Sequence, residues 1–90
     1  MAEFFLQIQN KKGLHARAAA LFVKAIERYH AEVWVMLKGQ KVSGRSIMGL
    51  MMLAAGQGTV LTVEVEDGPE AEAIQTALTT LANDKFNEEE

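Results

Sequence analysis

Residues 4–26, FFLQIQNKKGLHARAAALFVKAI, contain two different apolar periods, and the change between them decides the expected fold. The first period is two residues long and is carried by Phe4, Leu6 and Ile8. This alternation predicts a strand with one buried face. From His15 the apolar residues recur at helical spacing, as Ala19, Phe22, Val23 and Ile26. The segment therefore predicts a strand, a loop over 10–13 and a helix that Tyr29 and His30 close.

The remaining sequence repeats the same two patterns. Alternation predicts strands over 32–37, 41–43 and 61–66, with a tight turn at 38–40. A short apolar helix is expected over 47–55, with Ser46 as N-cap and Gly56 as the left-handed residue that ends it. Pro69 suits the first position of a long last helix, whose stripe is Ile74, Ala77, Leu78 and Leu81. Residues 88–90 are expected to form a solvated tail.

The element order is strand, helix, strand, strand, helix, strand, helix. Because each strand has a single apolar face, the sheet should be covered by helices on one side only. We therefore expect an α+β fold, with a four-stranded antiparallel sheet and three helices on one face. A chain of 90 residues is expected to form a single domain, residues 1–90, with its function on the surface.

The composition argues against several classes of function. The net charge is −3, and no basic stripe predicts nucleic-acid binding. Without cysteine and with two histidines, the sequence predicts no disulfide, no metal site and no bound cofactor. The N-terminus does not resemble a secretory signal, and the apolar run 47–55 is too short to span a bilayer. We expect a cytoplasmic protein that does not insert into membranes.

The segment 13–19, GLHARAA, is the best candidate for chemistry because it lies where a loop becomes a helix. The first N–H groups of a helix lack helical partners and form an anion site. Arg17 adds a guanidinium matched to phosphate. His15 offers a nitrogen nucleophile that can attack phosphorus. Taken alone, His-x-Arg is weak evidence, and the alternative is a histidine cap beside a solvated arginine. His30 is interpreted as structural.

The apolar helix that follows Ser46 is the second candidate. Its sequence, IMGLMML over residues 47–53, cannot bury every side chain against a sheet. We expect Leu50 and Leu53 in the core and Met48 and Met51 at an interface, since flexible methionines suit contact with several partners. Ser46 is first of all a helix cap, although a phosphate would also suit that helix end.

These two motifs together resemble a known family. GLHAR, residues 13–17, is similar to the active-site motif of HPr, the histidine phosphocarrier family of the bacterial phosphoenolpyruvate-dependent phosphotransferase system. RSIMGLM, residues 45–51, is similar to that family's regulatory-serine motif. The element order matches, and the resemblance covers essentially the whole chain. It implies an open-faced sandwich with the sheet order 1-4-2-3, in a phosphocarrier rather than a free-standing enzyme.

The resemblance also implies roles for individual residues. His15 would accept the phosphoryl group on its δ1 nitrogen from Enzyme I and pass it to an enzyme IIA domain, and Arg17 would help to hold it. Ser46 would be the target of an HPr kinase/phosphorylase where that enzyme exists. The docking patch for partners would comprise Ala16, Ala20, Ile47, Met48 and Met51. The chain is expected to be a monomer. Ala18 departs from the family, which usually has proline there; the site should survive, with partner preference or transfer rate affected.

Three alternatives remain at this level. A nitrogen-related branch of the same system would regulate rather than carry sugar, and the apolar helix does not distinguish the two. An HPr-like regulatory binding module would act mainly through Ser46, but such proteins lack the histidine at position 15. An unrelated α+β domain that binds a small ligand would need a pocket of convergent polar groups, and the sequence shows no such cluster.

Overall fold

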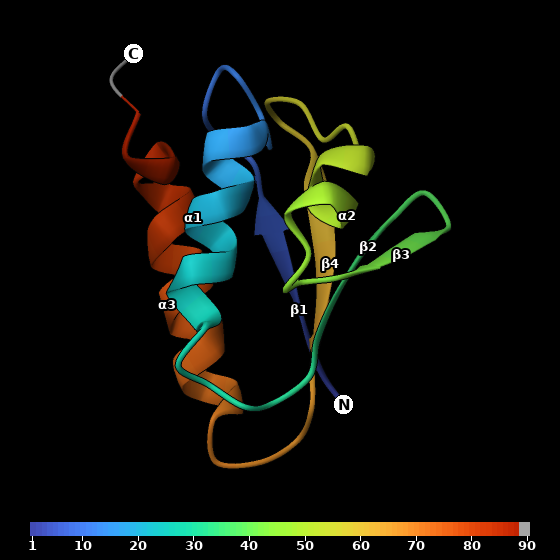
Figure 1. The fold of residues 1–90 in the computed structure, drawn as a ribbon, viewed down its shortest axis with the longest axis vertical. Coiled ribbons are helices and arrows are strands. Elements are labelled where there is room, and N and C mark those ends of the chain that lie inside the picture. The colour runs from blue at the N-terminus through green and yellow to red at the C-terminus, as the bar shows by residue number, and fades with distance from the viewer. Residues whose placement is uncertain (89–90) are drawn as a thin grey trace.

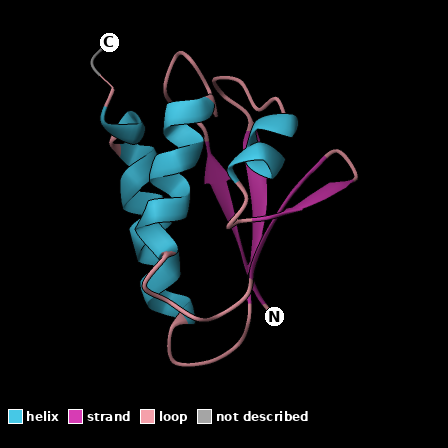
Figure 2. Cartoon of the chain, in the orientation of Figure 1, coloured by secondary structure: helices cyan, strands magenta, loops and turns pink. Residues whose placement is uncertain are grey.

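A computed structural model describes residues 1–88, and its strands form one sheet of order β1-β4-β2-β3 in which every pair is antiparallel. The helices lie on one face of this sheet, as Figures 1 and 2 show. Both features agree with the expected α+β fold. The elements in chain order are β1 (Ala2–Gln7), α1 (Ala16–Ile26), β2 (Val33–Leu37), β3 (Gln40–Ser43), α2 (Ile47–Met52), β4 (Val60–Val65), α3 (Ala71–Asn83) and η1 (Lys85–Asn87).

The register of the strands places the alternating apolar residues in one layer. Phe4 pairs with Val63 across β1 and β4, and Val35 pairs with Val63 across β2 and β4. These residues face the helices and are buried. Because side chains alternate along a strand, the intervening residues of β1 and β4, such as Phe5 and Thr62, lie on the uncovered face.

Helix α1 is the centre of the helical layer and contacts both α2 and α3. Its buried side chains are Ala18, Ala19, Phe22 and Ile26. The start of α1 and the η1 turn that follows α3 lie at the same end of the molecule (Figure 1). Two segments far apart in sequence are therefore brought together at that end.

Helix α1 ends at Ile26, earlier than the expected closure at Tyr29 and His30. The Arg45 guanidinium explains this end, because it donates hydrogen bonds to three carbonyl oxygens, at 3.0 Å, 2.8 Å and 2.7 Å. These oxygens belong to Ile26, Tyr29 and Ala31. The last carbonyls of a helix need such partners, so Arg45 fastens the segment before α2 to the end of α1.

Two further boundaries differ from expectation. Helix α2 ends at Met52, and the left-handed residue after it is Ala54, with φ +52°, rather than Gly56. Helix α3 begins at Ala71, so Pro69 lies before the helix. The Glu70 carboxylate accepts hydrogen bonds from the backbone N–H groups of His30 and Ala31, at 2.8 Å and 2.9 Å. These contacts with distant residues position the chain before α3.

Candidate functional site

The loop before α1 is fixed by backbone contacts with the segment after α2. Gly13 is buried with φ +68°, and a Cβ atom there would lie 2.4 Å from the Ala55 oxygen. The neighbouring Leu14 N–H donates to that same oxygen at 2.8 Å. The glycine therefore allows the close backbone approach expected from the sequence. The loop before α1 approaches the backbone of residues 55–56.

His15 occupies the N-cap position of α1, in extended conformation with φ −79° and ψ −178°. Its carbonyl oxygen accepts from the Ala19 N–H at 2.8 Å, but its side chain makes no capping hydrogen bond. The N–H groups of the first turn, Ala16 to Ala18, have no helical partners. The start of α1 thus carries partial positive charge. Because the N-cap side chain does not bond to the first N–H groups, these groups remain open to an anion.

The imidazole ring is bonded to the end of the chain. His15 Nε2 forms a short contact with the Glu88 carboxylate atom Oε2, and the same oxygen accepts a hydrogen bond from Asn10 Nδ2 at 3.0 Å. Asn10 Nδ2 also donates to the Gly13 oxygen at 2.7 Å. The exposed fraction of the side chain is 29% for His15 and 9% for Glu88. Glu88 is therefore not part of a solvated tail, while residues 89 and 90 lie outside the described residues.

Glu88 is negatively charged at neutral pH. Burial raises the pKa of its carboxyl, but hydrogen bonds from His15 and Asn10, with the nearby charges of His15 and Lys12, outweigh burial and place the pKa below its ordinary value of 4.5. A carboxylate accepts only, so His15 Nε2 must carry the proton of their hydrogen bond. His15 Nδ1 makes no hydrogen bond within residues 1–88.

Arg17 lies in the first turn of α1 and is exposed. Within the described part of the chain its guanidinium makes no hydrogen bond or ion pair. The structure therefore does not bring Arg17 into direct contact with His15. Its donors are available to an anion at the helix start. Ala18, at the position where the family usually has proline, is fully buried.

Ser46 caps α2, as the sequence predicts. Its Oγ accepts from the Gly49 N–H at 3.0 Å, and its carbonyl accepts from the Leu50 N–H at 3.0 Å. Leu50 and Leu53 are buried, also as predicted. The exposed fractions on the other side of α2 are 41% for Ile47, 74% for Met48, 42% for Met51 and 69% for Met52.

The exposed apolar residues of α1 and α2 make up what we call the apolar surface, comprising Ala16, Ala20, Ile47, Met48, Met51 and Met52. The sequence analysis omitted Met52, although its spacing of four residues from Met48 places it on the same side of the helix. A hollow of about 290 Å³ has both His15 and Met51 of this surface in its lining. Its lining residues are Lys12, Leu14, His15, Met51, Ala54, Ala55 and Gly56.

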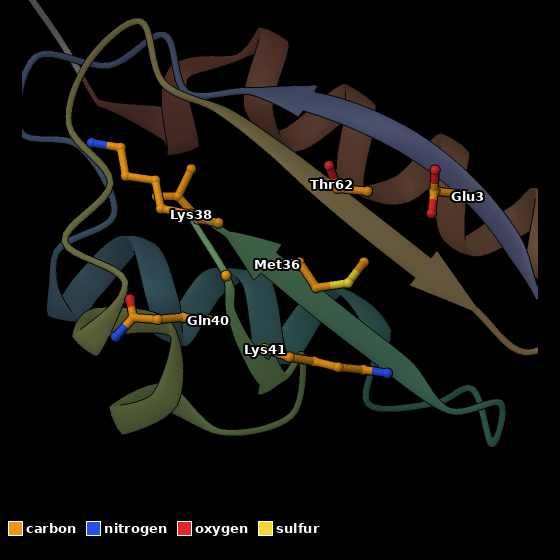
Figure 3. A pocket seen from close by; sticks show the side chains of 8 residues that line it. Glu3, Met36, Lys38, Gln40, Lys41 and Thr62 are labelled. Atoms are coloured by element: carbon orange, nitrogen blue, oxygen red, sulfur yellow. The ribbon is translucent and has the colours of Figure 1, made fainter.

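A larger hollow, about 600 Å³, lies on the uncovered face of the sheet. Figure 3 shows Glu3, Met36 and Thr62 from three strands along it, with Lys38 and Lys41 extending in opposite directions. Its polar groups do not converge on one point, so it lacks the usual features of a small-ligand site. Within residues 1–88, no group of three or more acidic or histidine side chains could hold a metal ion. No helix in that range is long and apolar enough to cross a membrane.

Fold and site together define a small α+β protein that presents a histidine at a helix start beside an exposed apolar surface. Residues 2–84 match the family model described as "PTS HPr component phosphorylation site". The chain belongs to this HPr family of phosphocarriers of the phosphotransferase system.

Individual relatives agree with this assignment. The phosphocarrier protein HPr of Neisseria meningitidis is 49% identical over 85 residues, which cover 94% of each chain. A crystal structure of HPr from Thermoanaerobacter tengcongensis is similar over 100% of both chains, with TM-score 0.90 and 41% identity. Another structure from that organism, described as an HPr dimer, has TM-score 0.74 and 41% identity and covers 98% of this chain and 100% of its own.

Proposed function

We propose that His15 accepts a phosphoryl group from phosphorylated Enzyme I and transfers it to an enzyme IIA domain. One observation carries the proposal: His15 stands at the start of α1 with Nδ1 unpaired among the described residues and with the first-turn N–H groups of the helix beside it. A neutral Nδ1 can attack phosphorus, and the N–H groups favour the dianionic product. The phosphoryl group would therefore reside on Nδ1.

Arg17 is assigned to the same step as a source of positive charge. Its exposed guanidinium lies on the first turn of α1 and has no competing partner within residues 1–88. Such a fork of donors can follow the phosphoryl group during transfer without bonding to phosphorus.

The partners are proposed to dock on the apolar surface. It adjoins the hollow that contains His15, so a protein seated on Met48 and Met51 would cover the reacting nitrogen. Flexible methionine side chains can adapt to two partners of different shape. Since Enzyme I and IIA would share one surface, they would bind in turn. We propose that the chain acts as a cytoplasmic monomer made of one domain over residues 1–90.

Ser46 is proposed as the site of regulation by an HPr kinase/phosphorylase in an organism that has one. Ser46 is a partly exposed residue at the start of α2, next to Ile47 and Met48. A phosphate carries a charge of roughly −1.5 to −2 and would sit beside the apolar surface. Docking would then require that charge to be desolvated, which opposes binding.

The test is incubation with Enzyme I and phosphoenolpyruvate, followed by mass analysis of intact protein and peptides. One acid-labile phosphate on the peptide containing His15 supports the proposal, and its subsequent loss on addition of IIA supports transfer. Absence of label on His15 would contradict it and favour the regulatory module acting through Ser46. Comparing rates with the sugar-branch and nitrogen-branch Enzyme I separates those two relays.

A further inference from the structure

Leucine and methionine lie on opposite sides of the segment formed by α2 and the residue that follows it. Leu50 and Leu53 are buried, with exposed fractions of 0% and 5%. The three methionines of the same segment are exposed, at 74% for Met48, 42% for Met51 and 69% for Met52. The two residue types have similar volume and nearly the same helix propensity. The outer side of α2 therefore differs from its inner side chiefly by carrying thioether sulfur atoms.

The other sulfur atoms of the chain also lie outside the core. The chain has five methionines and no cysteine, and the core residues described within 1–88 include no methionine. Met1 is 53% exposed, and Met36 is partly buried on the uncovered face of the sheet, where Figure 3 shows it. A reaction confined to sulfur would therefore alter the surface and leave the packing of the core intact.

We propose that Met48, Met51 and Met52 form a reversible oxidation site, at which peroxides control the docking of the phosphotransfer partners. This role rests on the proposed function of the apolar surface. Oxidation to the sulfoxide turns a flexible apolar side chain into a polar one. All three changes would lie on the surface that a partner must cover. Met51 also lines the hollow that contains His15, so its oxygen would stand at the edge of the phosphoryl site.

The oxidation balances with one molecule of peroxide for each sulfur. A sulfur lone pair attacks one oxygen of hydrogen peroxide and forms the S–O bond, while the O–O bond breaks and its electron pair leaves with the other oxygen as hydroxide. The hydroxide then takes the proton from the sulfur-bound oxygen, which yields water and the neutral sulfoxide. Sulfur loses two electrons and the peroxide gains them. Methionine sulfoxide reductases reverse the change.

Oxidation should weaken docking while the chemistry at His15 continues. A sulfoxide oxygen is a hydrogen-bond acceptor, and an apolar interface offers it no donor, so its desolvation opposes binding. We therefore expect the carrier concentration that half-saturates Enzyme I to rise about tenfold on oxidation. The nucleophile and the first-turn N–H groups of α1 are not modified, so the limiting rate of transfer should change less than twofold.

The experiment treats the full chain with hydrogen peroxide, removes the peroxide and locates the added oxygen atoms by mass analysis of peptides. It compares the wild type, the triple variant Met48→Leu/Met51→Leu/Met52→Leu and the control Met36→Leu, which removes one sulfur away from the apolar surface. Transfer from phosphorylated Enzyme I is measured against carrier concentration before and after treatment, with a thermal melt of each sample. Each variant is referred to its own untreated value.

Wild type and Met36→Leu should show the rise in half-saturation, with unchanged melting temperatures, and the two classes of methionine sulfoxide reductase should restore both proteins. The triple variant should change less than twofold on treatment. Sulfoxides on α2 without an effect on half-saturation would overturn the proposal, as would an equal effect in the triple variant or a loss of docking that follows unfolding. Untreated wild type that takes no label on His15 would instead overturn the proposed function, and the control of docking with it.

Discussion

The starts of α1 and α2 use their N-cap residues in opposite ways. Ser46 directs its hydroxyl back to the Gly49 N–H and satisfies the helix it begins. His15 has the equivalent backbone position, but its ring is bonded to Glu88 and makes no capping hydrogen bond. The first helix start therefore leaves its N–H groups without a side-chain cap, while the second is capped by its own serine. The comparison teaches that a helix start stays open to a ligand when its N-cap side chain is bonded elsewhere.

Among substitutions at the two helix starts, His15→Ala has the largest expected effect. Phosphoenolpyruvate-dependent labelling should be abolished, because the only proposed nucleophile is removed. The melting temperature should be nearly unchanged, because His15 is not among the residues of the hydrophobic core. Mass analysis after incubation with Enzyme I checks the first point and a thermal melt the second. Label that persists on the variant would assign the chemistry to another residue.

Arg17→Gln should slow transfer without preventing it. The guanidinium supplies charge at the α1 start but forms no bond to phosphorus, so we expect the rate to fall by about tenfold, less than in an enclosed site. The measurement is the rate of label transfer to His15 at fixed Enzyme I. An unchanged rate would reduce Arg17 to a solvated charge.

Ser46→Asp should weaken docking while α2 still forms. Aspartate caps about as well as serine, but its charge adjoins Ile47 and Met48. At low carrier concentration, we expect phosphorylation of His15 by Enzyme I to slow by roughly fivefold, since a charge opposes desolvation.

Ser46→Ala is the matched control. It should lose about 1 kcal/mol of unfolding free energy through the missing cap and keep its phosphorylation rate. If Enzyme I phosphorylated Ser46→Asp at the wild-type rate, that result would contradict the docking argument. A large drop in the melting temperature of Ser46→Asp would show a further role of Ser46 in the fold.

The smallest expected effect is the pH dependence of the Glu88 contact. The pKa of the Glu88 carboxyl is lowered in the folded protein from its ordinary 4.5. A lowered carboxyl pKa contributes stability that is present above the unfolded pKa and lost as pH falls through the folded one. The difference in melting temperature between wild type and Glu88→Gln should therefore be constant near neutral pH and shrink below about pH 4.5. A difference that grows on acidification would contradict the charged contact.

Most of the fold follows from patterns that act locally. The alternation of Phe4, Leu6 and Ile8 and the stripe through Phe22 and Ile26 correctly gave a strand, a helix and their buried faces. The cap at Ser46 was predicted for the same reason, since its hydroxyl serves an N–H three residues away. The boundaries were less predictable: Arg45 ends α1 by reaching carbonyls 14 to 19 residues distant, and no local period records such a contact.

By itself, the sequence determined the secondary elements, the buried faces and the histidine at a helix start. These properties depend on spacing and residue type within a few positions. Only the tertiary structure decided that Glu88, 73 residues from His15 in sequence, holds Nε2, and that buried Asn10 anchors it. The physical reason is that a hydrogen bond acts over about 3 Å of space irrespective of chain separation. The turn at Phe86, imposed by packing in the core, closes that separation.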